Sequence, residues 1–236
     1  MSKTMERGIL KKKTKDGYER KLYHMELIGE NYLPEIIELQ DVVVNNLNMS
    51  EIFQSDSEEF FKYELRKGGK IIGVFSEKKL IAYRFITVPK TDSMNLGIDL
   101  ALPKKELERV GHLETTIVHP DYRGNGLQRK TLYYALEIFN EMNCNHICST
   151  ISPKNYHSLR NVMSGGLVIK KLKEKYGGKM RYILHRDLKQ TPRKEYDKII
   201  DIDNVETVKR ERILEQGFVG YQALKKAEGF AVRYGM

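Results

Sequence analysis

The feature that most constrains the fold is an apolar run that ends in a glycine-rich turn and passes directly into a helix. Residues 113–118 predict a strand, residues 123–126 form the turn, and residues 127–141 predict a helix. A second apolar run at residues 146–151 predicts another strand. Two strands connected through a helix lie parallel in one sheet, so we expect an α/β protein built around a parallel β-loop-α-β unit.

The rest of the chain predicts further elements around this unit. In chain order they are a strand at 20–29, helices at 33–47 and 57–67, a hairpin of strands at 70–75 and 80–88, a helix at 155–164, and strands at 167–173 and 180–188. After Pro192 the pattern restarts as a strand, a helix and a strand. We therefore divide the chain into a basic N-terminal segment (1–19), a main domain (20–190) and a small C-terminal appendage (191–236).

The glycine-rich turn has the chemistry of an anion-binding site. Where a strand passes through glycines into a helix, unpaired backbone N–H groups and the positive end of the helix face one small volume. Gly124 and Gly126 let the backbone approach an anion closely, and Arg123 adds positive charge. Leu127 excludes a P-loop, which needs a lysine at that place, and Arg129 excludes the dinucleotide-binding fingerprint, which needs a small residue.

The segment that contains this turn resembles the pyrophosphate-binding motif of the GNAT superfamily of acyl-CoA-dependent N-acetyltransferases, Gln/Arg-x-x-Gly-x-Gly/Ala. Residues 123–127 fit this motif, and Val118, Pro120 and Tyr122 stand at the family's upstream positions. Gln128 replaces the small residue that usually closes the motif. We expect its amide to contact the phosphate instead.

The order of the elements over residues 20–188 is also similar to that of the GNAT family. The resemblance implies a mixed, mostly antiparallel, twisted sheet with the parallel unit at its centre and helices on both faces. It does not cover residues 192–236. Three roles are open for that segment: it would extend the sheet, cover the acceptor cleft, or make a homodimer contact.

The resemblance implies that acetyl-CoA binds as the co-substrate. Backbone groups at the end of the strand would hold the pantetheine, the turn would hold the pyrophosphate, and a second family motif that begins at Asn155 would add further contacts. The residues implied in binding are Ile117, Val118, His119, Arg123, Gly124, Asn125, Gly126, Leu127, Gln128, Asn155 and Asn161.

Acetyl transfer needs a base, because a primary amine with a pKa of about 10 is protonated at neutral pH. The resemblance places that base at Glu114, and the alternative is a Glu114 that faces solvent or pairs with a lysine. In the second motif, Val162 stands where many members have the tyrosine that protonates the leaving thiolate. Tyr156 and Ser158, on the same predicted helix, are the remaining candidates for that role.

We therefore expect an N-acetyltransferase that moves an acetyl group to a primary amine by direct attack in a ternary complex. The acceptor would be a small molecule or a peptide. An acidic connector between the first two helices would attract a cationic amine. Its carboxylates are Glu51, Asp56, Glu58 and Glu59. The missing tyrosine leaves an alternative, an acyl-CoA-binding regulatory or scaffold module without turnover.

The net charge of +9 raises the alternative of a nucleic-acid partner. Most of this excess lies in residues 170–194, where ten basic side chains accompany two acidic ones. The chain carries no recognised nucleic-acid-binding motif. We therefore expect a solvated basic surface there and no nucleic-acid binding.

The distribution of apolar residues indicates the compartment. No apolar run approaches the roughly 18 residues of a membrane span, and residues 1–21 lack the apolar segment of a signal peptide, so we expect a cytoplasmic protein without membrane contact.

Cys144, His146 and Cys148 alternate on one face of a predicted strand. Two sulfurs about 13 Å apart cannot share an ion that needs them within about 4 Å, so we expect no metal site.

Overall fold

The structure is a computed structural model that describes residues 4–46, 55–193 and 195–236. The chain forms two compact units. Unit 1 comprises Met1–Val88 and Leu113–Glu137, and unit 2 comprises Pro89–His112 and Ile138–Met236. Strand β5 (Val110–Val118) and helix α4 (Leu127–Glu141) therefore each contribute residues to both units.

Unit 1 contains a sheet with the strand order β1-β2-β3-β4-β5. Adjacent strands from β1 to β4 are antiparallel. Besides its parts of β5 and α4, its elements are β1 (Thr4–Thr14), β2 (Gly17–Ile28), a 3-10 turn (Glu30–Tyr32), α1 (Leu33–Asn46), α2 (Glu58–Arg66), β3 (Lys70–Ser76), β4 (Lys79–Thr87) and a second 3-10 turn (Pro120–Tyr122).

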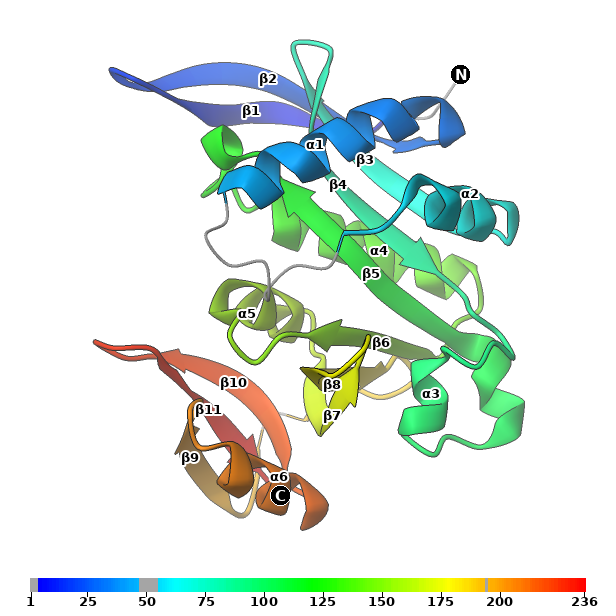
Figure 1. Ribbon diagram of the computed structural model, residues 1–236, viewed down its shortest axis with the longest axis vertical. Helices are drawn as coiled ribbons and strands as arrows, with labels where there is room; N and C mark the ends of the chain where they lie inside the picture. Colours follow the sequence, from blue (N-terminus) through cyan, green and yellow to red (C-terminus); the bar gives the residue numbers. More distant parts are fainter. Residues whose placement is uncertain (1–3, 47–54, 194) are drawn as a thin grey trace. The chain divides into compact units, whose positions relative to one another are not determined.

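Helices cover both faces of the sheet in unit 1 (Figure 1). On one face α1 and α2 pack over the strands, and Ile36, Phe61 and Tyr83 belong to the same buried cluster. On the other face α4 begins, and its first residue Leu127 packs in a cluster with Val118 of β5. Each face of unit 1 therefore has its own helices and its own apolar core.

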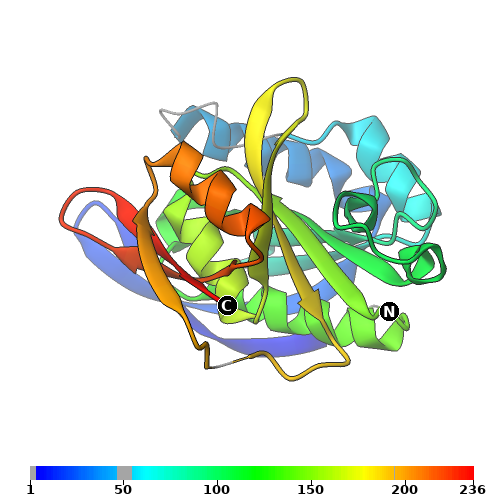
Figure 2. The ribbon, with the colours of Figure 1, turned by 90° about the horizontal axis from the view of Figure 1, so that it is seen from below.

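Unit 2 contains strands in the order β5-β6-β8-β7-β10-β11-β9. Residues 110–112 of β5 pair in parallel with residues 146–148 of β6, as the β-loop-α-β unit predicts. Figure 2 shows the β7–β8 hairpin in yellow and the C-terminal elements in orange and red. The elements of unit 2 are α3 (Leu96–Asp99), a 3-10 turn (Lys104–Arg109), β6 (His146–Ile151), α5 (Tyr156–Ser164), β7 (Val168–Lys175), β8 (Lys179–Asp187), β9 (Ile199–Asp203), α6 (Thr207–Glu215), β10 (Val219–Lys225) and β11 (Phe230–Gly235).

The predicted fold class is confirmed. The strands form a mixed and mostly antiparallel arrangement that includes one parallel pair, and helices accompany the sheet. The bounds of α4 and β6 coincide with the predicted ones. Ser57 caps α2, because its Oγ accepts the backbone N–H of Phe60 at 3.2 Å.

Two strands lie where the sequence predicts none. Strand β1 falls in the basic segment 1–19, and only Leu10 of its side chains is buried, so the strand carries no apolar alternation. Strand β10 falls in the appendage, where the sequence predicts only a strand, a helix and a strand. Because Gly220 of β10 pairs with Ile169 of β7, the appendage extends the sheet of unit 2, which is one of the three roles considered. Glu51 and Lys194 lie outside the described residues.

Candidate functional site

The glycine-rich turn in unit 1 forms an open cradle of backbone. Gly124 has a φ of +84° and Gly126 a φ of +70°, a conformation that side-chain-bearing residues rarely adopt. No atom lies within 4 Å of a Cβ added at either glycine, so the space beside them is open. Helix α4 begins at Leu127, and its first-turn N–H groups have no partner within the helix. The cradle therefore fits an anion such as a pyrophosphate.

A buried arginine lies beneath this turn. Arg84 of β4 is 3% exposed, and its guanidinium donates to the backbone oxygen of Gln128 at 3.0 Å and to Thr131 Oγ1 at 3.3 Å. No carboxylate pairs with it among the described residues, and burial lowers its pKa to about 9. A buried cation beside the positive end of a helix is stabilised by a bound anion. The sequence analysis missed Arg84, whose only signal is a single charge inside an apolar strand.

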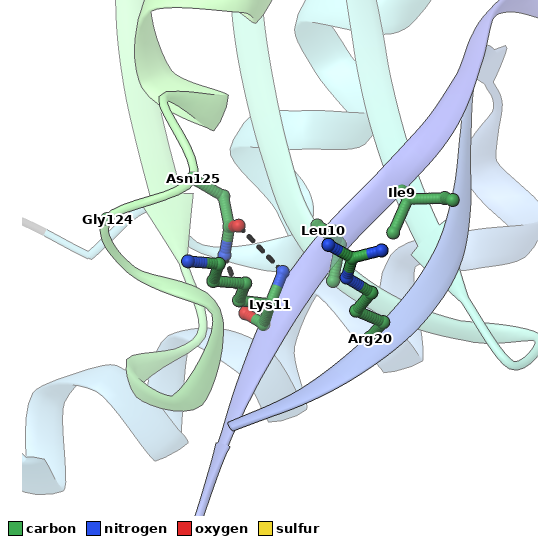
Figure 3. A pocket seen from close by; sticks show the side chains of 6 residues that line it. All are labelled: Ile9, Leu10, Lys11, Arg20, Gly124 and Asn125. Atoms are coloured by element: carbon green, nitrogen blue, oxygen red, sulfur yellow. Dashed lines mark hydrogen bonds between the residues drawn. The ribbon is translucent and has the colours of Figure 1, made fainter. Parts of the chain in front are cut away.

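The turn is also attached to the N-terminal hairpin. Asn125 Oδ1 accepts the backbone N–H of Lys11 at 2.8 Å, and its Nδ2 donates to the oxygens of Lys11 at 2.7 Å and Tyr122 at 2.9 Å. A hollow of about 480 Å³ lies at this junction (Figure 3). It is lined by Ile9, Leu10, Lys11, Arg20, Gly124 and Asn125. The amide of Asn125 thus holds β1 against the turn, and the hairpin brings two basic side chains beside it.

A second contact ties the hairpin to α4. The carboxylate of Glu6 on β1 accepts hydrogen bonds from the hydroxyl of Tyr23 and from the ammonium group of Lys130. Hydrogen bonds from Tyr23 and Lys130 favour the ionised carboxylate, so the pKa of Glu6 lies below its usual value although burial opposes this. Strand β1 therefore belongs to the surroundings of the turn, although the sequence does not indicate this.

The end of β5 is the edge of the sheet in unit 1. The N–H of His119 donates to the oxygen of Ile81 in β4 at 2.8 Å, so this group is engaged within the sheet. Because successive residues of a strand point their N–H groups to opposite sides, Val118 directs its N–H and C=O away from β4. His119 Nδ1 accepts the N–H of Asp121 at 3.2 Å, and burial lowers the pKa of the imidazole. The side chain of His119 is therefore engaged within its own turn.

Two carboxylates occupy the same region of unit 1. Glu114 of β5 accepts the hydroxyl of Thr87 at 2.7 Å. Asp56, which precedes α2, accepts the hydroxyl of Thr115 at 2.5 Å. Burial raises the pKa of Asp56 to about 7; the hydrogen bond from Thr115 lowers it, and the charge of Glu114 adds to the rise. The sequence presents Asp56 only as one of four acidic residues; in the structure it bonds Thr115, whereas Glu58 pairs with Lys62.

The second group of predicted residues lies on α5 in unit 2. Asn155 caps this helix, since its Oδ1 accepts the N–H of Ser158 at 3.0 Å. The ring of Tyr156 lies 5.3 Å from that of Phe230 on β11. Asn161 donates to the oxygen of His157 at 2.9 Å, and Val162 is buried. Thus, the two asparagine amides serve the helix itself, and Tyr156 packs on the C-terminal strands.

The described residues contain no group of three side chains that could hold a metal ion. Cys144 and Cys148 are buried free thiols, and burial raises the pKa of both, that of Cys144 to about 11. Within the described part of the chain, no helix has the length and apolar character needed to cross a membrane.

Comparison with known proteins places these observations in a family. A model of the acetyltransferase (GNAT) family matches residues 35–161. A protein of Acinetobacter baylyi classed as an acetyltransferase has a similar fold, with 15% identity, a TM-score of 0.56, and coverage of 74% of this chain and 98% of that one. A comparison with curated proteins found no match.

Two further solved structures are similar to this chain. A Salmonella typhimurium protein, also classed as an acetyltransferase and solved with acetyl-CoA, is 16% identical with a TM-score of 0.54, covering 72% of this chain and 98% of that one. The ribosomal-protein-alanine N-acetyltransferase of Brucella melitensis is 16% identical with a TM-score of 0.52, covering 70% of this chain and 99% of that one. At these identities the likeness concerns the fold.

Proposed function

The chain belongs to the acetyltransferase (GNAT) family, and we propose that, as an N-acetyltransferase, it moves an acetyl group from acetyl-CoA to a primary amine by direct attack in a ternary complex. The observation that carries this proposal is the backbone cradle at Gly124 and Gly126 above the buried cation Arg84. Coenzyme A is a polyanion, and this cradle joins a helix N-terminus with a buried guanidinium that has no carboxylate partner among the described residues.

The residues that would hold the pyrophosphate are those of the turn and the first turn of α4. Backbone N–H groups at Gly124, Gly126, Leu127 and Gln128 would bind it, and Arg123 would add charge from its exposed position. Asn125 takes a different role from the others, because its amide bonds Lys11 and Tyr122 and positions the turn.

The pantetheine would bind along the edge of β5. Val118 directs its N–H and C=O to that edge, and Ile117 and His119 flank it. An extended ligand that adds to a strand edge gains main-chain hydrogen bonds, and an N–H at the reacting carbonyl stabilises developing negative charge. When bound, acetyl-CoA supplies the activated thioester.

Proton transfer requires a base for the amine and an acid for the leaving thiolate. Glu114 is the base that the family resemblance suggests, and with Asp56 it brings negative charge that attracts a cationic amine. Tyr156 and Ser158 are the candidates for the acid. Asn155 and Asn161, at the same helix, would contribute to binding the coenzyme. The acceptor is a small molecule or a peptide in the cytoplasm. The peptide class agrees with the name of the Brucella melitensis neighbour, a ribosomal-protein-alanine N-acetyltransferase.

One observation favours a second candidate function, an acyl-CoA-binding regulatory or scaffold module without turnover. Val162 occupies the place of the usual tyrosine and is buried, so it supplies no acid. Such a module would bind acetyl-CoA through the same cradle and would leave it intact.

Thiol release from acetyl-CoA, measured with a panel of primary amines, separates the two functions. Calorimetry with acetyl-CoA alone tests binding first. Binding together with amine-dependent thiol release establishes the transferase; binding without release from any amine favours the module. No binding at all would overturn both functions.

A further inference from the structure

We propose that Asp56 is the residue that binds the ammonium group of the acceptor and takes up its proton before the amine attacks the thioester. This assignment rests on the proposed acetyl transfer. It gives the proton-accepting role to Asp56 instead of Glu114. It also defines the acceptor as a cation, whose amine would bind on the face of the unit 1 sheet that α1 and α2 cover.

The position of Asp56 is fixed from two elements. The side chain of Gln40 on α1, which is 2% exposed, donates to the backbone oxygen of Asp56 at 3.0 Å and accepts its backbone N–H at 3.1 Å. Thr115 of β5 donates to the carboxylate at 2.5 Å. A carboxylate oxygen can accept more than one hydrogen bond, so the contact with Thr115 leaves acceptor capacity for an ammonium group. A carboxylate held this way is preorganised rather than mobile.

A second polar group in the same place lacks a partner. Tyr83 of β4 is 0% exposed, and its hydroxyl has no hydrogen-bond partner among the described residues. The charge of Asp56 contributes to raising the pKa of this hydroxyl, although burial contributes more, so the two groups lie within electrostatic range. Buried hydroxyls are normally satisfied, and an acceptor N–H beside Asp56 would satisfy this one.

The environment of Asp56 suits a base. Among the described residues, the groups that act on it are Thr115 and Glu114 from β5, Gln40 from α1 and Tyr83 from β4, and none of these four is a cation. Burial raises the pKa of the carboxyl to about 7. An ordinary aspartate has a pKa of about 3.9, so Asp56 accepts a proton from an ammonium group roughly 10³-fold more favourably. The same carboxylate is still largely ionised at slightly alkaline pH.

The proposed step balances in atoms and charge. The ammonium group of the acceptor gives one proton to the Asp56 carboxylate, and the freed nitrogen lone pair forms the bond to the acetyl carbon. The carbon–sulfur bond breaks, and its electron pair leaves with the sulfur of coenzyme A. That thiolate takes one proton from Tyr156, Ser158 or water. Nitrogen loses its second proton to the group or water that protonated the thiolate, and Asp56 returns its own proton to solvent.

The kinetic test compares Asp56→Asn with Asp41→Asn, a matched change at an exposed aspartate on α1. Spermidine, alanylglycine and a lysine-containing tripeptide serve as amine probes in the thiol-release assay. For any probe that turns over, Asp56→Asn is expected to lower kcat/KM by about 10²–10³-fold. Acetyl-CoA affinity stays within twofold of wild type in both variants. Asp41→Asn keeps wild-type kcat/KM.

The pH profile gives a readout that a structural role would not move. The acidic limb of the wild-type profile follows the carboxyl of Asp56 and is absent in Asp56→Asn. Thr115→Val removes the hydrogen bond that lowers this pKa, so its acidic limb moves to higher pH. Glu114→Gln lowers activity less than Asp56→Asn does. A larger loss in Glu114→Gln, with Asp56→Asn within twofold of wild type, overturns the assignment.

A second measurement is independent of turnover. In protein labelled with ¹³C at aspartate carboxyls, the signal lost in Asp56→Asn is expected to titrate near pH 7 and to shift with methylammonium chloride. Tetramethylammonium chloride, which has the charge but no N–H, should shift it less. A titration near pH 4, or no response to methylammonium, overturns the role of Asp56. If wild type releases no thiol with any probe, acetyl transfer to these amines fails, and the carboxyl titration still decides the assignment of Asp56.

Discussion

The two faces of the sheet in unit 1 carry opposite charges, a buried arginine and a half-buried aspartate. On the face toward α4, Arg84 bonds two neutral groups, the oxygen of Gln128 and the hydroxyl of Thr131. On the face toward α1 and α2, Asp56 bonds the hydroxyl of Thr115, again a neutral group. Among the described residues neither charge has an oppositely charged hydrogen-bond partner.

This difference separates two tasks that one sheet must perform. An unpaired buried charge destabilises a folded chain, so packing alone does not explain either residue. A cation beside the turn matches an anionic coenzyme, whereas an anion on the other face matches a cationic amine. The sheet thus keeps the two ligands' charges on opposite faces, which prevents Arg84 and Asp56 from neutralising each other.

The largest effect is expected from Gly126→Glu, which places a carboxylate at the cradle on the basic face. The φ of +70° strains any side chain, and the glutamate would occupy the open space and repel a phosphate. We expect acetyl-CoA binding to be abolished in calorimetry.

Gly229→Glu is the matched control for this change. Gly229 lies between β10 and β11 with a φ of +69° and, like Gly126, has no atom within 4 Å of an added Cβ. It should lose a similar amount of stability and keep its affinity. Unchanged acetyl-CoA affinity in a folded Gly126→Glu protein would remove the turn from the binding site.

The second prediction removes the charge from the basic face. Arg84→Met keeps a long side chain but deletes the buried cation, so we expect the acetyl-CoA Kd to rise about tenfold, which corresponds to about 1.4 kcal/mol. The affinity should also become less sensitive to salt. Since a buried unpaired charge is costly, the free energy of unfolding should change little.

Calorimetry at two salt concentrations checks this, with Arg66→Met, at an exposed arginine of α2, as the control. Equal affinities for Arg84→Met and wild type at both concentrations would show that Arg84 only supports α4. The comparison between the two faces would then rest on Asp56 alone.

Much of the fold could be predicted from local pattern. The turn, α4, β6 and α5 were predicted close to their bounds, because glycines, a capping residue and helical apolar spacing act within a few positions of each other. Strand β1 could not be predicted in this way. Its exposed positions are Arg7, Ile9, Lys11 and Lys13, and only Leu10 is buried, so the sequence shows no apolar period of two.

The residues of the candidate site also differ in whether local sequence could predict them. Glycine at positions 124 and 126 indicates a positive φ from the residue type alone. The environments of Arg84 and Asp56, in contrast, depend on partners far away in the chain. Asp56 is set by Gln40, 16 positions earlier, and by Thr115, 59 positions later. Arg84 meets Thr131 from 47 positions away. The sequence around Arg84 or Asp56 therefore gives the charge of the side chain but not its burial.

A smaller effect is expected from the acidic face, and it concerns stability. Burial raises the pKa of Asp56 from its ordinary 3.8 to about 7, so the folded state binds more protons between these values. Wild-type stability therefore falls as pH rises from about 4 to about 7. Asp56→Asn cannot ionise, so its Tm relative to wild type should be higher at pH 8 than at pH 4. Thermal denaturation at both pH values checks this, and Asp41→Asn should show no such trend.

The smallest effect is expected where the N-terminal hairpin joins the basic face. Asn125→Ala removes the hydrogen bonds to Lys11 and Tyr122 but leaves the glycines and Arg84 in place. Loss of about 1 kcal/mol would lower Tm by about 2–4 °C in a chain of this size. Since the turn is then less preorganised, the Kd for acetyl-CoA should rise about threefold. Asn140→Ala, at an exposed asparagine of α4, is the control for calorimetry and thermal denaturation. A lowered Tm with unchanged Kd would mean that β1 stabilises unit 1 without shaping the cradle, and the basic face would then reduce to the turn and Arg84.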